Sequence, residues 1–181
     1  TDIKNKQMRN KIKISVLVVA ILSLGYVAIA QQKVSLSLHQ DIRLGLIGDD
    51  IGNEAGTINI LARLKMQGHQ QKQGYIVVFP EFEYAEIEGN YKRYSANVGY
   101  TFNNLILEGF ETSAHIGWGF IDRYSKNFFS FGGSGEIAYK LNDTIKVSII
   151  GQFTERKDLK WMYNDNAIRF SGFAGLEINL N

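Results

Sequence analysis

The chain has 181 residues with 18 Gly, one Pro and no Cys, and its 20 Tyr and Phe residues favour strands. The absence of Cys excludes disulfides and thiolate metal sites. Residues 1–30 carry five of the 20 basic and one of the 18 acidic side chains, so the rest of the chain has a net charge of −2. Because no basic surface remains, nucleic-acid binding is not expected.

The N-terminal segment is typical of a secretory signal peptide. A short basic segment begins at Met8, an apolar run follows to Ile29, and Ala28 and Ala30 are small residues at the two positions that signal peptidase reads. We expect cleavage after Ala30. A retained membrane anchor is the alternative, because the apolar run approaches the roughly 17 residues that a spanning helix needs. The expected parts are an over-extended reading frame (residues 1–7), the signal peptide (8–30) and one β-barrel domain (31–181).

Apolar and polar residues alternate through the remainder of the chain. Side chains along a strand point to opposite faces in turn, so this pattern gives each strand one apolar and one polar face. It is clearest between Asn127 and Thr154, where the turn-forming pair Asn142-Asp143 separates two alternating runs. The pattern predicts eight strands, at about residues 33–46, 57–67, 75–87, 91–102, 105–121, 127–141, 144–155 and 166–180.

The predicted connections differ in length between the two ends of the strands. Asn103-Asn104 and Asn142-Asp143 are predicted to be tight turns, whereas Ile47–Gly56 and Glu155–Asn166 are long and polar. Transmembrane barrels have short turns at the periplasmic rim and larger loops outside. The spacing therefore favours an all-β, antiparallel, up-and-down barrel.

The alternation leaves open which face lies inside. A soluble lipocalin-like barrel has its apolar face inside, and a membrane barrel has the reverse. Here the polar face is rich in Gly and Ser, which suits a narrow lumen, and the apolar face carries aromatic residues such as Trp118 and Tyr139 toward both ends. We therefore predict that the apolar face meets lipid and that the lumen holds a mixed-charge network of Asp41, Arg43, Arg63, Lys65, Glu81, Glu83, Arg93, Glu111, Glu136, Lys146, Arg169 and Glu177.

With this signal, strand number and alternation, residues 33–181 resemble the small outer-membrane β-barrel proteins of diderm bacteria, the eight-stranded group that includes the OmpA transmembrane domain, OmpX and OmpW. The resemblance implies a location in the outer membrane after removal of the signal peptide, with outer-membrane lipid around the barrel. It also implies a role in envelope structure, in surface contact through the loops, or in the passage of small apolar molecules.

The same group includes enzymes that modify lipid A. Ser113, His115 and Glu111 share one face of a predicted strand and are the weak candidates for a catalytic relay. That face is predicted to point into the lumen, whereas a lipid-modifying enzyme needs its nucleophile open to the outer leaflet, so no catalysis is expected. The three His residues lie in separate elements without ligand spacing, so neither a metal site nor a cofactor is expected.

The predicted loop at residues 155–166 combines aromatic and basic side chains. Such a composition on a rigid barrel is typical of a contact surface for an extracellular ligand or surface partner. The alternative is that its aromatic residues anchor the rim among lipid headgroups. The residues assigned to this surface are Trp161, Tyr163, Arg156 and Lys160.

Overall fold

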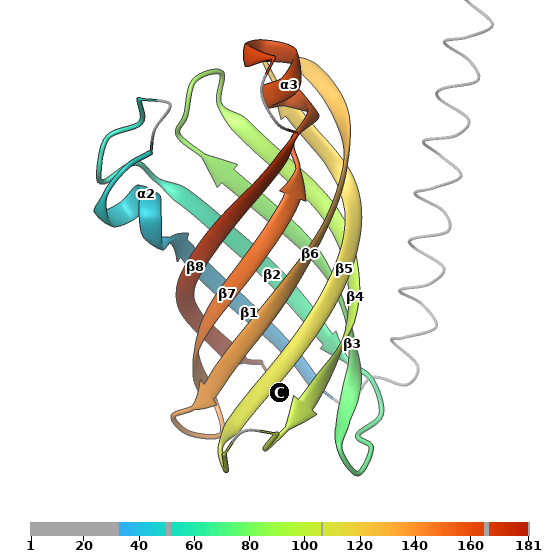
Figure 1. Cartoon of the computed structure of the whole chain (residues 1–181). Helices are drawn as coiled ribbons and strands as arrows, with labels where there is room; N and C mark the ends of the chain where they lie inside the picture. The colour runs from blue at the N-terminus through green and yellow to red at the C-terminus, as the bar shows by residue number, and fades with distance from the viewer. Residues whose placement is uncertain (1–32, 50–51, 106, 165–166, 181) are drawn as a thin grey trace, which may run out of the picture.

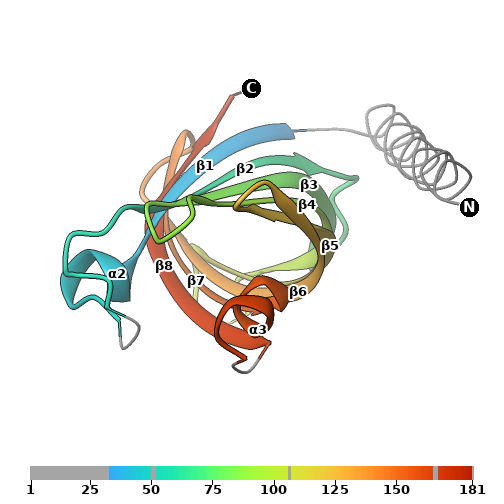
Figure 2. The same ribbon diagram turned by 90° about the horizontal axis from the view of Figure 1, so that it is seen from above.

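The alternating segments form eight strands that pair in chain order. In the computed structural model, which describes residues 33–49, 52–105, 107–164 and 167–180, these strands form a closed barrel (Figures 1 and 2). The strands are β1 (Lys33–Asp41), β2 (Asn59–Gln67), β3 (Gly74–Ala85), β4 (Tyr91–Asn103), β5 (Phe110–Arg123), β6 (Lys126–Lys140), β7 (Ile145–Glu155) and β8 (Ile168–Asn179).

Each strand is antiparallel to both of its neighbours, and β8 closes the barrel against β1. Leu38 of β1, for example, lies opposite Ala62 of β2 on one side and Leu176 of β8 on the other. The predicted eight-stranded antiparallel barrel is therefore confirmed. The predicted signal peptide and the segment before Met8 lie outside the described residues. Within the described part of the chain, no helix is both long and apolar enough to cross a membrane.

The two ends of the barrel differ. The β2–β3, β4–β5 and β6–β7 connections lie at one end with the C-terminus, and we call this the turn end (Figure 1). The opposite end, which we call the loop end, carries two short helices, α2 (Ile42–Leu46) and α3 (Lys157–Tyr163).

The first predicted strand is wrong beyond Asp41, where α2 replaces residues 42–46 of the predicted strand. The Asp41 carboxylate accepts a hydrogen bond of 2.9 Å from the Leu44 backbone N–H, which satisfies a free donor in the first turn of the helix. Leu44 is buried and Leu46 is 74% exposed, so two residues that would share one face of a strand instead lie on opposite sides of a helix.

The β4–β5 connection also differs from its prediction. Asn103 still belongs to β4, and β5 begins only at Phe110, so the predicted tight turn at Asn103-Asn104 and the predicted strand start at residue 105 are both wrong. Asn104 and Gly109 have positive φ angles of 55° and 84°, and the Gly109 N–H donates to Asn104 Oδ1 at 3.0 Å. A side-chain hydrogen bond of this kind replaces strand pairing with a wider turn.

The outer face of the barrel is apolar along its whole length. Ile116, in the middle of β5, is 54% exposed, and Ile149 on β7 is 61% exposed. Aromatic rings pack against one another on this face, as in the Phe120–Phe129 pair with ring centres 5.9 Å apart. Outward-facing aromatic residues lie toward both ends: Tyr84, Trp118, Phe120 and Phe129 toward the loop end, and Tyr100, Phe102 and Tyr139 toward the turn end.

The inner face carries the opposite set of side chains. Most of them are polar or charged and are less than a tenth exposed. Small apolar clusters separate them, one of which joins Leu61, Ile150 and Phe173 from β2, β7 and β8. The buried polar and charged side chains therefore lie in the lumen and at its loop end.

Candidate functional site

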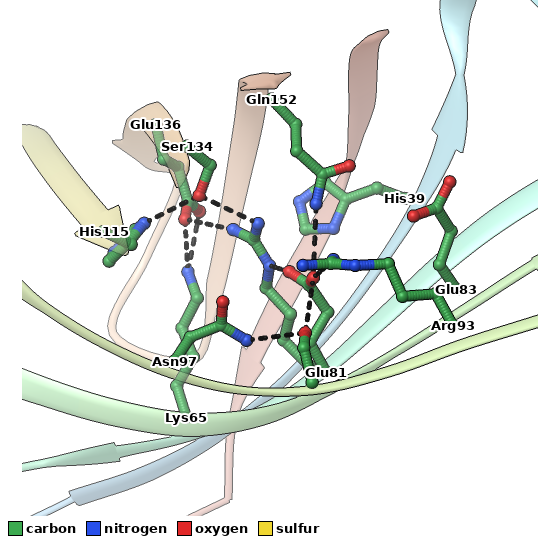
Figure 3. Close-up of polar contacts among 12 residues, drawn as sticks. His39, Lys65, Glu81, Glu83, Arg93, Asn97, His115, Ser134, Glu136 and Gln152 are labelled. Atoms are coloured by element: carbon green, nitrogen blue, oxygen red, sulfur yellow. Dashed lines mark hydrogen bonds and ion pairs between the residues drawn. The ribbon is translucent and has the colours of Figure 1, made fainter. Parts of the chain in front are cut away.

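The lumen holds an unbroken series of ion pairs in which positive and negative groups alternate, and Figure 3 shows the part around Lys65, Glu81, Arg93 and Glu136. Glu136 on β6 lies 2.7 Å from Lys65 Nζ and 3.2 Å from Arg63 Nη1, both on β2. Arg63 Nε lies 2.8 Å from Glu81, which is in turn 2.6 Å from Arg93 Nη1. Each of these carboxylates thus contacts two cations, which offsets the loss of hydration on burial.

The series continues from Lys65 toward the turn end. Lys65 Nζ lies 2.5 Å from Glu177, and Glu177 lies 3.0 Å from Lys146. Lys146 and Lys140 contact the two oxygens of Glu111 at 2.8 and 3.0 Å. The Lys140 side chain is 47% exposed, so the series of ion pairs ends at the solvent-accessible turn end.

Several of these contacts cross the lumen. β2 and β6 lie on opposite sides of the eight-stranded ring, so the contacts of Arg63 and Lys65 with Glu136 span its width. Gln152 of β7 donates to Glu81 of β3 at 3.2 Å, which is a second pair of opposite strands. In the turn half of the lumen a cavity of about 10 Å³ remains, near the smallest volume that holds one water.

The three weak catalytic candidates all face the lumen, but each is engaged by a residue outside the proposed relay. Ser113 Oγ hydrogen-bonds Thr101 Oγ1 at 2.9 Å, and His115 Nδ1 hydrogen-bonds Ser134 Oγ at 3.2 Å. Glu111 is held by the two lysines described above. The geometry therefore gives Ser113 no base that activates it among its hydrogen-bond partners.

A second group of charges fixes α3 over the lumen at the loop end. Asp158, which is fully buried, lies 2.9 Å from Arg123 Nη1 and 2.7 Å from Arg156 Nη2. The Arg156 guanidinium also lies over the Tyr91 ring at 4.0 Å, a cation–π contact. Sequence reasoning missed Asp158, Arg123 and Tyr91, because they come from segments far apart in the chain and only the barrel register brings them together.

This group of charges predicts acid sensitivity of α3. Burial alone raises the pKa of Asp158, but the hydrogen bonds and charges of Arg156 and Arg123 outweigh it and hold the pKa below its ordinary value of 3.8. A carboxylate with a lowered pKa in the folded state contributes stability above its unfolded pKa, and this contribution is lost as the pH falls through the folded value. We therefore expect α3 to stay docked at neutral and mildly acidic pH and to detach only as the pH falls below the ordinary Asp pKa of 3.8.

Tryptophan fluorescence can measure this detachment. The chain has two Trp residues, so a Trp118→Phe background leaves Trp161 of α3 as the reporter. In the Asp158→Asn variant we expect α3 to be loosened at neutral pH and the acid transition to disappear. An unchanged acid transition in Asp158→Asn would show that other groups control α3.

The remaining predicted lumen charges lie outside the series of ion pairs. Asp41 caps α2, and Arg169 on β8 lies at the loop end. Arg43 was predicted on the polar face of a strand, and this is wrong because the strand ends at Asp41 and Arg43 belongs to α2. Glu83 is 4% exposed, and it accepts a hydrogen bond of 3.3 Å from Tyr91 Oη.

The predicted contact residues do not form one surface. Trp161 is 48% exposed, and its ring contacts Lys126 Nζ at 3.6 Å and the Phe128 ring at the start of β6. Lys160 is also exposed, whereas the Arg156 side chain is 11% exposed and points inward to Asp158. Tyr163 Oη donates to the Glu88 carboxylate across the loop end. The predicted contact loop is therefore divided between exposed residues at the rim and an inner group at the mouth of the barrel.

A cavity of about 150 Å³ lies at the mouth of the barrel, and we call it the mouth cavity. The ends of β1, β2, β3, β4, β5 and β8 line it together with α2 and α3. Its wall includes Asp41, Asn59, Glu83, Tyr91, Arg123 and Arg156.

Within residues 33–49, 52–105, 107–164 and 167–180, no three or more His, Asp or Glu side chains are placed to hold a metal ion.

No protein-family model matches this chain, and no curated protein sequence matches it. Among solved structures, the chain is similar to the Yersinia pestis outer membrane protein Ail in a phospholipid bilayer nanodisc, with 14% identity and a TM-score of 0.49 over 82% of this chain and 99% of Ail. It is also similar to Neisserial surface protein A, with 8% identity and a TM-score of 0.45 over 81% of this chain and 94% of that protein. A function for this chain has therefore to be inferred from its own geometry.

Proposed function

We propose that the chain is a non-enzymatic β-barrel protein of the bacterial outer membrane, with its outer face in lipid and its lumen filled by side chains. The single observation that carries this proposal is the inverted distribution of polarity. Arg63 and Arg93 are 1% exposed inside the barrel, whereas Phe170 is 80% exposed outside it. Water on the outside and an apolar ligand inside require the opposite arrangement.

The soluble lipocalin-like alternative is disfavoured by the same residues. Large apolar side chains exposed on every strand would form a continuous apolar surface, far larger than the few hundred Å² that soluble monomers expose. In lipid, this surface is solvated by acyl chains. The aromatic residues toward both ends suit the two membrane interfaces.

A role in structure or surface contact is favoured over the passage of small apolar molecules. An apolar molecule moving along the lumen would have to separate the Arg63–Glu136 and Lys65–Glu136 pairs that cross it. Leaving such charges buried and unpaired is costly. The loop end is then the part of the molecule that is free to make contacts, and exposed Trp161, with Lys126 beside it at the rim, suits a position among lipid headgroups.

A lipid A modifying activity is the weaker alternative. Ser113 and His115 are less than a tenth exposed and are bonded to Thr101 and Ser134 inside the barrel, where an outer-leaflet lipid has no access. If Ser113→Ala or His115→Ala abolished a change in lipid A acylation while the barrel still assembled, the non-enzymatic proposal would have to be abandoned.

Gel mobility of the detergent-extracted outer-membrane fraction tests the main proposal. We expect unheated protein to migrate faster than boiled protein, because a closed barrel in detergent stays compact, and we expect the mature chain to begin at Gln31. Recovery of folded protein by osmotic shock, without detergent and without a mobility difference, would support the soluble barrel instead.

A further inference from the structure

Glu83, like Asp41, is an exception among the buried carboxylates of the described residues. Glu81, Glu111, Glu136 and Glu177 each contact two cationic side chains, and so does Asp158 at the loop end. No ion pair joins Glu83 to a lysine or arginine of the described residues, and in Figure 3 no dashed line reaches its carboxylate. Its hydrogen bond with Tyr91 Oη is long, at 3.3 Å.

Glu83 lies in the wall of the mouth cavity, beside two other oxygen acceptors. Asn59 on β2 lies opposite Ala85 of β3, two residues along the strand from Glu83, and Asp41 at the end of β1 lies 3.4 Å from Asn59 Nδ2. Asn59 is 5% exposed, and its Oδ1 is buried without a hydrogen-bond partner. One side of the cavity therefore carries two carboxylates and an amide oxygen whose capacity to accept hydrogen bonds is only partly used.

The cavity wall also carries four cations, Arg43, Arg123, Arg156 and Arg169. Arg123 and Arg156 both bind Asp158, and Arg156 also lies over the Tyr91 ring. Leu44 and Leu159, which are buried, add apolar surface. The charges of Arg93 and Arg156 act on Glu83, but neither arginine forms an ion pair with it. The acceptors near Glu83 therefore keep unused hydrogen-bonding capacity, which suits a cationic donor.

We propose that the mouth cavity binds a small primary amine, whose ammonium group pairs with the Glu83 carboxylate and has Asn59 Oδ1 and Asp41 as further acceptors on the same wall. An ammonium group supplies three N–H donors, and the aromatic and apolar part of the wall suits a short carbon chain. The volume of about 150 Å³ admits a molecule of several heavy atoms. A bare metal ion is disfavoured because the described His, Asp and Glu side chains do not converge as ligands.

The test uses the folded full barrel in detergent micelles and two probes of similar shape, n-butylamine and n-butanol. Binding is followed by the NMR signals of the Asn59 side-chain amide and the Tyr91 ring. We expect the amine to give saturable shifts, the alcohol to give none, and Glu83→Gln to weaken amine binding by about tenfold or more, because a charge-assisted hydrogen bond is lost. Glu86→Gln, on an exposed residue of the next loop, is the matched control and should not change the affinity.

The gel-mobility difference between unheated and boiled protein verifies that each variant is folded. Amine binding that Glu83→Gln leaves unchanged would overturn the proposal, and so would equal binding of the alcohol or no binding of either probe to the folded protein. Calcium alone is a third probe. If Ca²⁺ saturates the same signals and displaces the amine, the site is a metal site and the assignment of an amine is wrong.

Discussion

Replacing Glu136 with leucine is expected to lower the free energy of unfolding by about 3 to 5 kcal/mol. Glu136 is the partner that Arg63 and Lys65 share across the lumen, and its side chain is 1% exposed. Leucine fills a similar volume but leaves two buried cations with less compensation on the far side of the ring. The loss should be measured by urea unfolding of the barrel in lipid vesicles, followed by the gel-mobility difference.

A matched variant and a double variant separate the charge effect from other effects of the substitution. Glu86→Leu removes an exposed carboxylate and should change the stability by no more than about 0.5 kcal/mol. Lys65→Met combined with Glu136→Leu should cost less than the sum of the single changes, by about 0.5 to 3 kcal/mol, because the two groups are in contact. Additive losses, each below about 1 kcal/mol, would mean that the cross-lumen pairs contribute little to stability.

The faces of the strands could be predicted from the sequence because they depend only on alternation. Glu81 and Arg63, for example, occupy inward positions whatever the neighbouring strand does. Their partners could not be predicted, because the register and tilt of the strands decide which inward side chains reach the same depth. Arg63 and Glu136 lie 73 positions apart in the chain, and nothing local in the sequence relates them.

The ends of the strands were harder to predict than the strands themselves. Beyond Asp41 the sequence still alternates through Leu44 and Leu46, yet a helix begins there, capped by the hydrogen bond that the Leu44 N–H donates to the Asp41 carboxylate. In the loop between β7 and β8, Arg156 would be expected at the surface, because it is a charged residue in a polar loop. Its inward position depends on Asp158, which sequence reasoning did not relate to Arg156 or to Arg123.

The mouth cavity could not be predicted for the same reason. Asp41, Asn59 and Glu83 come from three strands and are inward-facing residues of ordinary type. Their unmet hydrogen-bonding capacity becomes visible only when the ion pairs of the neighbouring carboxylates are known. The unused hydrogen-bonding capacity of these residues can be recognised only when the positions of all neighbouring side chains are known.

Introducing a charge on the outer face tests the assignment of that face to lipid. Ile116 lies near the middle of β5 and is 54% exposed on the apolar outside of the barrel. An arginine at the middle of a lipid-facing strand costs about 2 to 4 kcal/mol. We therefore expect Ile116→Arg to lower the stability in vesicles by about this amount and to reduce the yield of protein with the mobility of a folded barrel.

Leu107→Arg is the matched control, because Leu107 is 63% exposed but lies in the β4–β5 turn, beyond the end of the strands. A charge there remains in water or among headgroups in a membrane barrel, so its effect should be close to zero. In a soluble barrel both positions face water, and an arginine at either would be tolerated equally. Equal stability of the two variants would therefore contradict the membrane assignment, whereas a loss confined to Ile116→Arg follows only if the middle of the outer face is in contact with acyl chains.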